Sequence, residues 1–388
     1  MKHQVQVDEE YDKLIRPILV ISKLIAVWPL KEDRPFSATV FRICHVVFLL
    51  FMLLSLSIAL TIDIFYNTND VDEVNERILF GCVCYLSVIR VIIFSFHQKD
   101  ILYVIEAMRN DWIGSSYEER AILRNKCLLA YRLAKYFITV IVGNGFVYVL
   151  VPIFEMNFLS DVERTLPFHG YFFANQTVSP IYEYLYVVDA IGGLSAGWTV
   201  ASATSFTLIV AIHGSVKFMM LQRRLETIKR DDPDVDRVIA NCIRRHQDAI
   251  TFADAFERIS NLLVLGQFVT SIGLVCFAGF QLAIMLHDNI QLYQTLIFLI
   301  LTILELYMFS LSGNKLIIES DAVGESAYRS DWIGGTFGRS LQIVMIRSRI
   351  PSRITVGKFC DVSLRSFTQV LSTSFSYMMV LFTIMTEE

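Results

Sequence analysis

The sequence predicts an all-α membrane protein with seven transmembrane helices. Hydrophobic residues make up 54% of its 388 residues, charged residues make up 19%, and the mean hydropathy is +0.50. Soluble domains average about 45–50% apolar and about 25% charged residues. A bilayer core takes about 20 apolar residues as a helix, and seven stretches of the chain are long enough. They run over residues 41–62, 78–96, 136–154, 184–212, 259–286, 295–312 and 359–385.

The fourth and fifth stretches exceed the thickness of a bilayer, so we expect them to tilt or to continue beyond the membrane. Polar segments over residues 218–230 and 235–258 are compatible with helices and predict helical extensions into the cytoplasm. Pro233 predicts a break between these two extensions. The first 40 residues lack the apolar core of a cleavable signal peptide, so the first span is expected to insert by itself.

The distribution of Lys and Arg predicts the orientation, because cytoplasmic loops carry the excess of these residues. Six lie before residue 41, five in residues 97–130, nine in residues 213–258 and seven in residues 313–358, whereas the intervening loops carry only Arg77 and Arg164. We therefore expect a cytoplasmic N-terminus and an extracellular C-terminus, the reverse of a G-protein-coupled receptor. Asn175 opens the only N-x-[ST] sequon, in a loop placed outside, where it could be glycosylated.

These assignments divide the chain into four parts. We expect residues 1–40 to form a cytoplasmic N-terminal segment and residues 41–312 to form a six-helix transmembrane bundle with cytoplasmic helical extensions. We expect residues 313–358 to form a cytoplasmic segment and residues 359–388 to form the seventh helix.

Several function classes find no support in the sequence. A net charge of -4 gives no reason to expect a nucleic-acid partner. The seven His residues are scattered, and the sequence has no H-E-x-x-H, G-x-S-x-G or phosphate-binding loop motif. The seven Cys residues include no C-x-x-C pair. We expect neither an enzyme nor a metal site nor a cofactor.

Three ionisable residues fall inside the predicted spans, where burying a charge is costly and functional roles are common. Arg90 lies in the inner half of the second span, and we favour a side chain that reaches the cytoplasmic interface. Asp189 lies near the outer end of a long span, so a solvated and a functional carboxylate are equally compatible with its position. Glu305 lies nearer the middle of the sixth span, and we expect it to face partner helices.

The final apolar helix has one partly hydroxylated face. Thr373, Ser376, Tyr377, Val380, Thr383 and Ile384 recur at intervals of three and four residues. A helix with such a face inside a membrane either packs on partner helices or lines water. Periodicity alone leaves both alternatives open.

The C-terminal residues resemble a known family. The matching motifs are Ala327-Tyr328 with Trp332, Pro351, Gly357-Lys358-Phe359, Phe367 and Ser376-Tyr377, together with Ser312-Gly313-Asn314. They are similar to the C-terminal signature of insect odorant receptors. Insect gustatory receptors end with Thr-Tyr and then Gln-Phe, whereas this chain has Ser376-Tyr377 and then Thr383-Ile384. The long insertion of the shared co-receptor is absent between residues 213 and 258, so the resemblance points to an odour-tuning subunit.

The resemblance implies an odorant-gated, nonselective cation channel in the plasma membrane of olfactory sensory neuron dendrites. Four seven-helix subunits would surround a pore formed by the seventh helices, and a tuning subunit would form a heterotetramer with the co-receptor. Residues 41–312 would be the ligand-sensing bundle, residues 313–358 the cytoplasmic anchor segment and residues 359–388 the pore-lining seventh helix. Residues 332–350 would be the inner part of a split seventh helix. The partners are then a volatile odorant, the co-receptor and membrane lipid. A gustatory-type ligand-gated channel or a seven-span transporter is the alternative.

The resemblance also assigns candidate residues to three roles. A small, mostly apolar odorant needs an enclosed, aromatic-lined site, and the family places it in the outer halves of spans two to six. The candidate ligand-binding residues are Tyr85, Phe146, Tyr148, Tyr186, Asp189, Phe277, Phe280 and Phe298. The pore and gate residues are Ser376, Val380, Thr383 and Ile384, and the assembly residues are Trp332, Tyr328 and Phe359.

Overall fold

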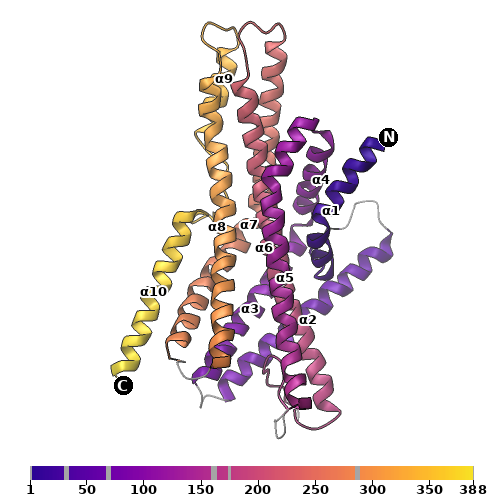
Figure 1. The fold of residues 1–388 in the computed structure, drawn as a ribbon, viewed down its shortest axis with the longest axis vertical. Helices are drawn as coiled ribbons and strands as arrows, with labels where there is room; N and C mark the ends of the chain where they lie inside the picture. The colour runs from indigo at the N-terminus through magenta and orange to yellow at the C-terminus, as the bar shows by residue number, and fades with distance from the viewer. Residues whose placement is uncertain are drawn as a thin grey trace.

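The computed structural model describes residues 2–29, 35–66, 71–158, 164–173, 176–284 and 289–387. Within these residues the chain forms ten helices and one two-stranded antiparallel sheet (Figure 1). The helices are α1 (Lys2–Leu24), α2 (Phe36–Tyr66), α3 (Val71–Phe96), α4 (Gln98–Gly114), α5 (Tyr117–Phe158), α6 (Ile181–Glu226), α7 (Val235–Ile284), α8 (Asn289–Arg329), α9 (Gly338–Ser348) and α10 (Leu364–Glu387). The strands are β1 (Thr355–Val356) and β2 (Cys360–Asp361).

Seven of these helices are long and apolar enough to cross a membrane, namely α2, α3, α5, α6, α7, α8 and α10. The predicted fold class is therefore confirmed. The helices α6 and α7 contain 46 and 50 residues, which at 1.5 Å per residue is about 69 and 75 Å. Because a bilayer core is about 30 Å thick, both helices continue well beyond it, as predicted. The expected break at Pro233 lies between the end of α6 and the start of α7.

Helix α6 is the central element of the bundle and packs against α2, α5, α7 and α8. Residues 199–211 of α6 are buried on every side. They include many small side chains, such as Ala201, Ser202, Ala203 and Thr204. Small residues let neighbouring helices approach closely in a membrane protein, which explains why so polar a segment forms the middle of the bundle.

Helices α1 and α4 pack together beside the long helices. The rings of Tyr11 and Trp112 lie 5.8 Å apart, and both side chains are buried. Asp111 of α4 joins this unit to α6, because its Oδ2 lies 2.9 Å from His213 Nε2 and 2.6 Å from Lys217 Nζ. Burial alone would raise the pKa of the Asp111 carboxyl, but the His213 hydrogen bond and the neighbouring charges outweigh it and lower that pKa.

The segment before the last helix differs from the prediction in two places. Helix α9 begins at Gly338 rather than at residue 332, because residues 330–337 form turns that include Gly334 at φ +80°. The last helix begins at Leu364 rather than at Phe359, because β1 and β2 form a tight hairpin with Gly357 at φ +56°. The seventh helix is split as expected, with this hairpin between its two parts. Helix α10 lies at one edge of the bundle, against α7 and α8 (Figure 1).

Candidate functional site

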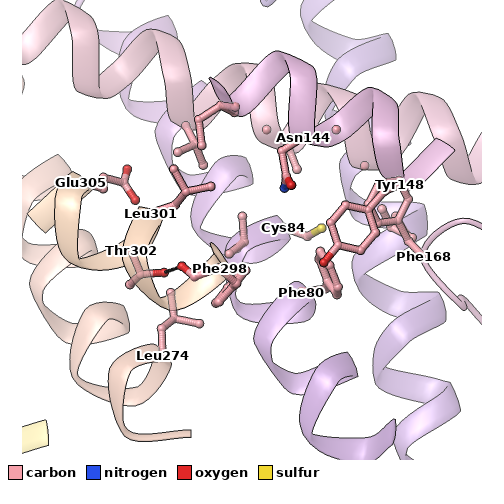
Figure 2. Close-up of a pocket in the computed structure, with 18 of the residues that line it drawn as sticks. Phe80, Cys84, Asn144, Tyr148, Phe168, Leu274, Phe298, Leu301, Thr302 and Glu305 are labelled. Carbon is pink, nitrogen blue, oxygen red and sulfur yellow. Dashed lines mark hydrogen bonds between the residues drawn. The ribbon is translucent and has the colours of Figure 1, made fainter. Parts of the chain in front are cut away.

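A cavity of about 110 Å³ lies within the bundle, lined by residues of α2, α3, α5, α6, α7 and α8. An engineered cavity of about 150 Å³ can hold benzene, and this cavity is somewhat smaller than that. Its wall is mostly apolar and carries a few polar groups from Asn144, Thr302 and Glu305 (Figure 2). Such a lining is typical of a site for a small, largely apolar molecule.

Four aromatic rings form one side of the cavity (Figure 2). The ring of Phe80 is central, with centroids 5.2 Å from Tyr148, 5.6 Å from Phe168 and 6.0 Å from Phe298. The Phe80 contacts are edge-to-face, and Tyr148 stacks on Phe168 with the centroids 5.8 Å apart. Aromatic pairs prefer these arrangements, so the four rings form a single packed wall.

Phe168 is the member of this wall that lies outside any helix, in the connection between α5 and α6. Its backbone N–H donates a hydrogen bond to Asp189 Oδ2 at 2.8 Å, and Asp189 is fully buried. Gly193, one turn further along α6, faces the Phe168 ring so closely that a Cβ would lie 2.0 Å from a ring carbon. Asp189 and Gly193 together hold this part of the connection inside the bundle. Asp189 is therefore not a solvated carboxylate.

The polar end of the cavity is a buried ion pair. Arg90 Nη2 donates to Glu305 Oε1 at 2.7 Å, and Thr204 Oγ1 donates to the same oxygen at 2.8 Å. Arg90 also donates to Gln267 Oε1. The network joins α3, α6, α7 and α8, and Arg90 is fully buried. The prediction that Arg90 reaches the cytoplasmic interface is wrong, because Glu305 offers its guanidinium a partner inside the bundle; the expectation that Glu305 faces partner helices is confirmed.

Of the eight sequence-predicted ligand residues, Tyr148 and Phe298 line the cavity and Asp189 positions Phe168. Phe146 is half-exposed, and Tyr85 exchanges a hydrogen bond with Thr61. The other three lie elsewhere: the Tyr186 hydroxyl donates to Val149 O, Phe277 packs in a small cluster with Leu79 and Leu274, and the Phe280 ring lies 5.3 Å from Phe382.

Sequence reasoning missed Phe80, Cys84, Asn144 and Phe168 among the lining residues. The Asn144 amide points into the cavity (Figure 2) and makes no side-chain hydrogen bond with any described residue. One signal could have found Phe168: an aspartate inside a span needs a buried partner, and the nearest connection in the chain offers backbone N–H groups.

Helix α10 has two distinct faces. One face packs on α7 and α8 through Val370, Ser374, Met378 and Phe382, at intervals of four residues. The other face carries Ser376, Val380, Thr383 and Ile384, all exposed in the single chain. The hydroxyls of Ser376 and Thr383 bond to carbonyls of α10 itself, so this face is partly hydroxylated and carries the apolar side chains of Val380 and Ile384 beside the two hydroxyls.

The candidate assembly residues lie on the surface. Tyr328 and Phe359 are 67% and 83% exposed. Trp332 is partly buried, and its Nε1 donates to Tyr328 O at 3.1 Å. The candidate glycosylation residue Asn175 lies outside the described residues.

Comparison with known proteins gives a consistent assignment. The family model described as 7tm Odorant receptor matches residues 70–375. Odorant receptor 13a of Drosophila melanogaster is 22% identical over 401 aligned positions, which cover 96% of each chain. Odorant receptor 10 of Aedes albopictus is 24% identical over 210 positions. These positions cover 52% of this chain and 56% of the length of that relative.

A solved structure of the insect olfactory receptor OR5 from Machilis hrabei, in complex with eugenol, has the same fold. Its TM-score is 0.82 at 16% identity, over 97% of this chain and all of that chain. With the family match over residues 70–375, these findings show that the chain belongs to the insect odorant receptor family, a family of multi-pass membrane proteins that act as odorant-gated cation channels.

Proposed function

We propose that this chain is an odour-tuning subunit that forms a heterotetrameric, nonselective cation channel with the odorant co-receptor. In this assembly the α10 helices of four subunits surround the pore. The chain works in the plasma membrane of olfactory sensory neuron dendrites, with its N-terminus in the cytoplasm.

The two faces of α10 are the observation that carries this proposal. A helix at the edge of a single subunit would place its apolar face towards lipid and its hydroxylated face towards its own bundle. Here the face with Ser376 and Val380 points away from the bundle, about 180° from the packed stripe at Ser374 and Met378. Several copies of α10 around an axis would enclose the face with Ser376 and Val380 in a narrow pore. Rings of apolar side chains close such a pore by dewetting.

The cavity supports a small, mostly apolar odorant as the ligand. The rings of Phe80, Tyr148, Phe168 and Phe298 supply hydrophobic contact, and few polar groups face the same space. We propose that the free amide of Asn144 orients odorants that carry a hydroxyl or carbonyl group. The OR5 receptor from Machilis hrabei was solved with eugenol, a small aromatic molecule of this chemical class.

An exposed tyrosine, Tyr328, and the partly buried Trp332 support assembly through the end of α8 and the segment after it. Tyr328 and Trp332 contact each other at the end of α8 with a centroid distance of 6.4 Å, and buried aromatics often dominate interface energetics. Trp332→Ala is expected to reduce co-purification with the co-receptor. Phe36→Ala, at an exposed aromatic residue near the start of α2, is the matched control and should not change it.

The decisive experiment is an odour-panel recording from cells that express the chain with the co-receptor, the chain alone, or the co-receptor alone. We expect odour-evoked single-channel currents only from cells that express the chain with the co-receptor. These currents should include responses to odorants to which the co-receptor alone does not respond. Robust currents from the chain alone would overturn the tuning-subunit assignment. Transport without channel openings would overturn the channel itself.

A further inference from the structure

A second, larger cavity of about 420 Å³ lies outside the candidate odorant site, between α5, α6 and α8. Helices α5 and α8 pack along α6, which leaves a groove with α6 as its floor. The Leu208 and Ile212 side chains line the floor, Leu129 and Leu133 line one wall, and Tyr307 and Leu311 line the other. No residue of this groove belongs to the cavity described above.

The groove changes from apolar to basic along its length. Towards the middle of the bundle it is lined by Leu133, Leu208 and Tyr307. Two turns further along the helices it is lined by Lys126 of α5 and Lys315 of α8, both exposed. Among the described residues neither lysine forms a salt bridge with an acidic side chain. The basic end therefore carries two unneutralised ammonium groups.

One acidic side chain, Glu319, also faces the basic end. Its carboxylate accepts a hydrogen bond from Gln222 Nε2 at 3.1 Å, and the same amide donates to the Glu319 carbonyl at 2.6 Å. This partner holds Glu319 against α6. The Gln222 amide is uncharged, so the Glu319 carboxylate keeps its charge, and Lys126, Lys315 and Glu319 together leave a net charge of +1 at this end.

In α6 and α8 the change from apolar to basic lies close to the predicted ends of the spans, at residues 212 and 312. In α5 the predicted span begins at residue 136, so Leu133 lies about one turn and Leu129 about two turns outside it, towards Lys126. Lys315 lies just beyond one of these boundaries, on the side that carries the excess of Lys and Arg, and Lys126 lies further out on the same side. That side is the cytoplasmic one by the positive-inside rule, and the cytoplasmic leaflet contains the anionic lipids.

We propose that this groove binds an anionic glycerophospholipid of the cytoplasmic leaflet. One acyl chain lies along Leu129, Leu133 and Leu311, and the headgroup lies at Lys126 and Lys315. Charge complementarity selects an anionic headgroup over a zwitterionic one, and the apolar floor selects a lipid over a soluble phosphate. The site is independent of the odorant cavity and does not rest on the proposed gating.

Photoactivatable phosphatidylserine, with a diazirine in its acyl chain, tests the site on the full chain purified with the co-receptor. We expect crosslinks on the peptides that contain Leu129 to Leu133 and Tyr307 to Leu311, competed by phosphatidylserine and not by phosphatidylcholine. An exposed Lys near a membrane surface contributes enough attraction for about a five-fold change in affinity. Lys126→Gln with Lys315→Gln should therefore weaken binding about 25-fold.

Lys135→Gln is the matched control, because Lys135 is also exposed on α5 but lies about 180° around the helix from Lys126. It should leave the crosslinks unchanged. Leu133→Trp keeps both lysines and fills the groove, so it should remove the crosslinks by blocking the acyl chain.

Three results would overturn the proposal. Crosslinks of equal yield in the double lysine variant and in the wild type would show that the basic end does not recognise the headgroup. Equal competition by glycerophosphoserine, which lacks acyl chains, would show a soluble-anion site. Crosslinks that appear only on the chain without the co-receptor would show that another subunit covers the groove.

Discussion

Asp189 accepts a hydrogen bond from the backbone N–H of Phe168 at 2.8 Å, and this bond fixes the one part of the aromatic wall that no helix carries. Leaving a buried backbone donor without its hydrogen-bond partner costs about 1–3 kcal/mol. Asp189→Ala would leave the Phe168 N–H without its partner inside the bundle. We expect lower thermal stability of the purified complex and lower sensitivity to odorants.

The control for this prediction is Tyr184→Phe, on an exposed side chain of the same helix. It should change neither the melting temperature nor the odour responses. If Asp189→Ala melts and responds like the wild type, the connection before α6 is held by other contacts.

The close contact between Gly193 and Phe168 allows a steric test of the aromatic wall of the cavity. A Cβ at this position would lie 2.0 Å from the Phe168 ring, so Gly193→Ala must displace that ring from the cavity. The rank order of an odour panel should change, and Phe168→Leu should restore part of it in the double variant. Gly143→Ala, where a Cβ would meet nothing within 4 Å, should preserve the wild-type rank order.

The Arg90–Glu305 pair predicts a loss of stability rather than a specific loss of response. Removing one partner of a buried ion pair costs about 3–5 kcal/mol, whereas replacing both with apolar residues is often neutral. Glu305→Leu should therefore reduce surface expression strongly. Arg90→Met combined with Glu305→Leu should recover most of it. A double variant as poorly expressed as the single one would mean that the charges serve a further purpose.

Asp111 predicts a pH dependence of the junction between α4 and α6. Its folded-state pKa is lowered from the ordinary 3.8, so the stabilisation from its carboxylate is present above pH 3.8 and is lost as the pH falls through the lower, folded-state pKa. Melting temperatures of the purified chain should fall at acid pH more for the wild type than for Asp111→Asn. Parallel curves would show that Asp111 is not a source of this acid sensitivity.

Hydropathy and charge could predict the seven spans, the extension of α6 and α7 beyond a bilayer and the break at Pro233, because these depend on residues close together in the chain. The candidate cavity depends on distant pairs. Arg90 and Glu305 are 215 residues apart in the chain, so each looked isolated in the sequence. The sequence did not indicate that Glu305 binds the Arg90 guanidinium inside the bundle and keeps it from the cytoplasmic interface. Phe168 lay outside every span. The hairpin before α10 was missed because its two strands have only two residues each.

Val380 provides the most direct test of the pore. Its side chain is 55% exposed on the face of α10 turned away from the bundle, one turn from Ser376 and one turn from Ile384. A ring of apolar side chains blocks ions by excluding water, and a hydroxyl at this position would let water enter. Val380→Ser should therefore raise the ligand-free current of the complex with the co-receptor or change its ion selectivity.

Phe375→Ser changes an equally exposed residue of α10 that lies about 140° around the helix from Val380, and it should leave the ligand-free current at the wild-type level. Unchanged basal current in Val380→Ser, at normal surface expression, would place the gate elsewhere.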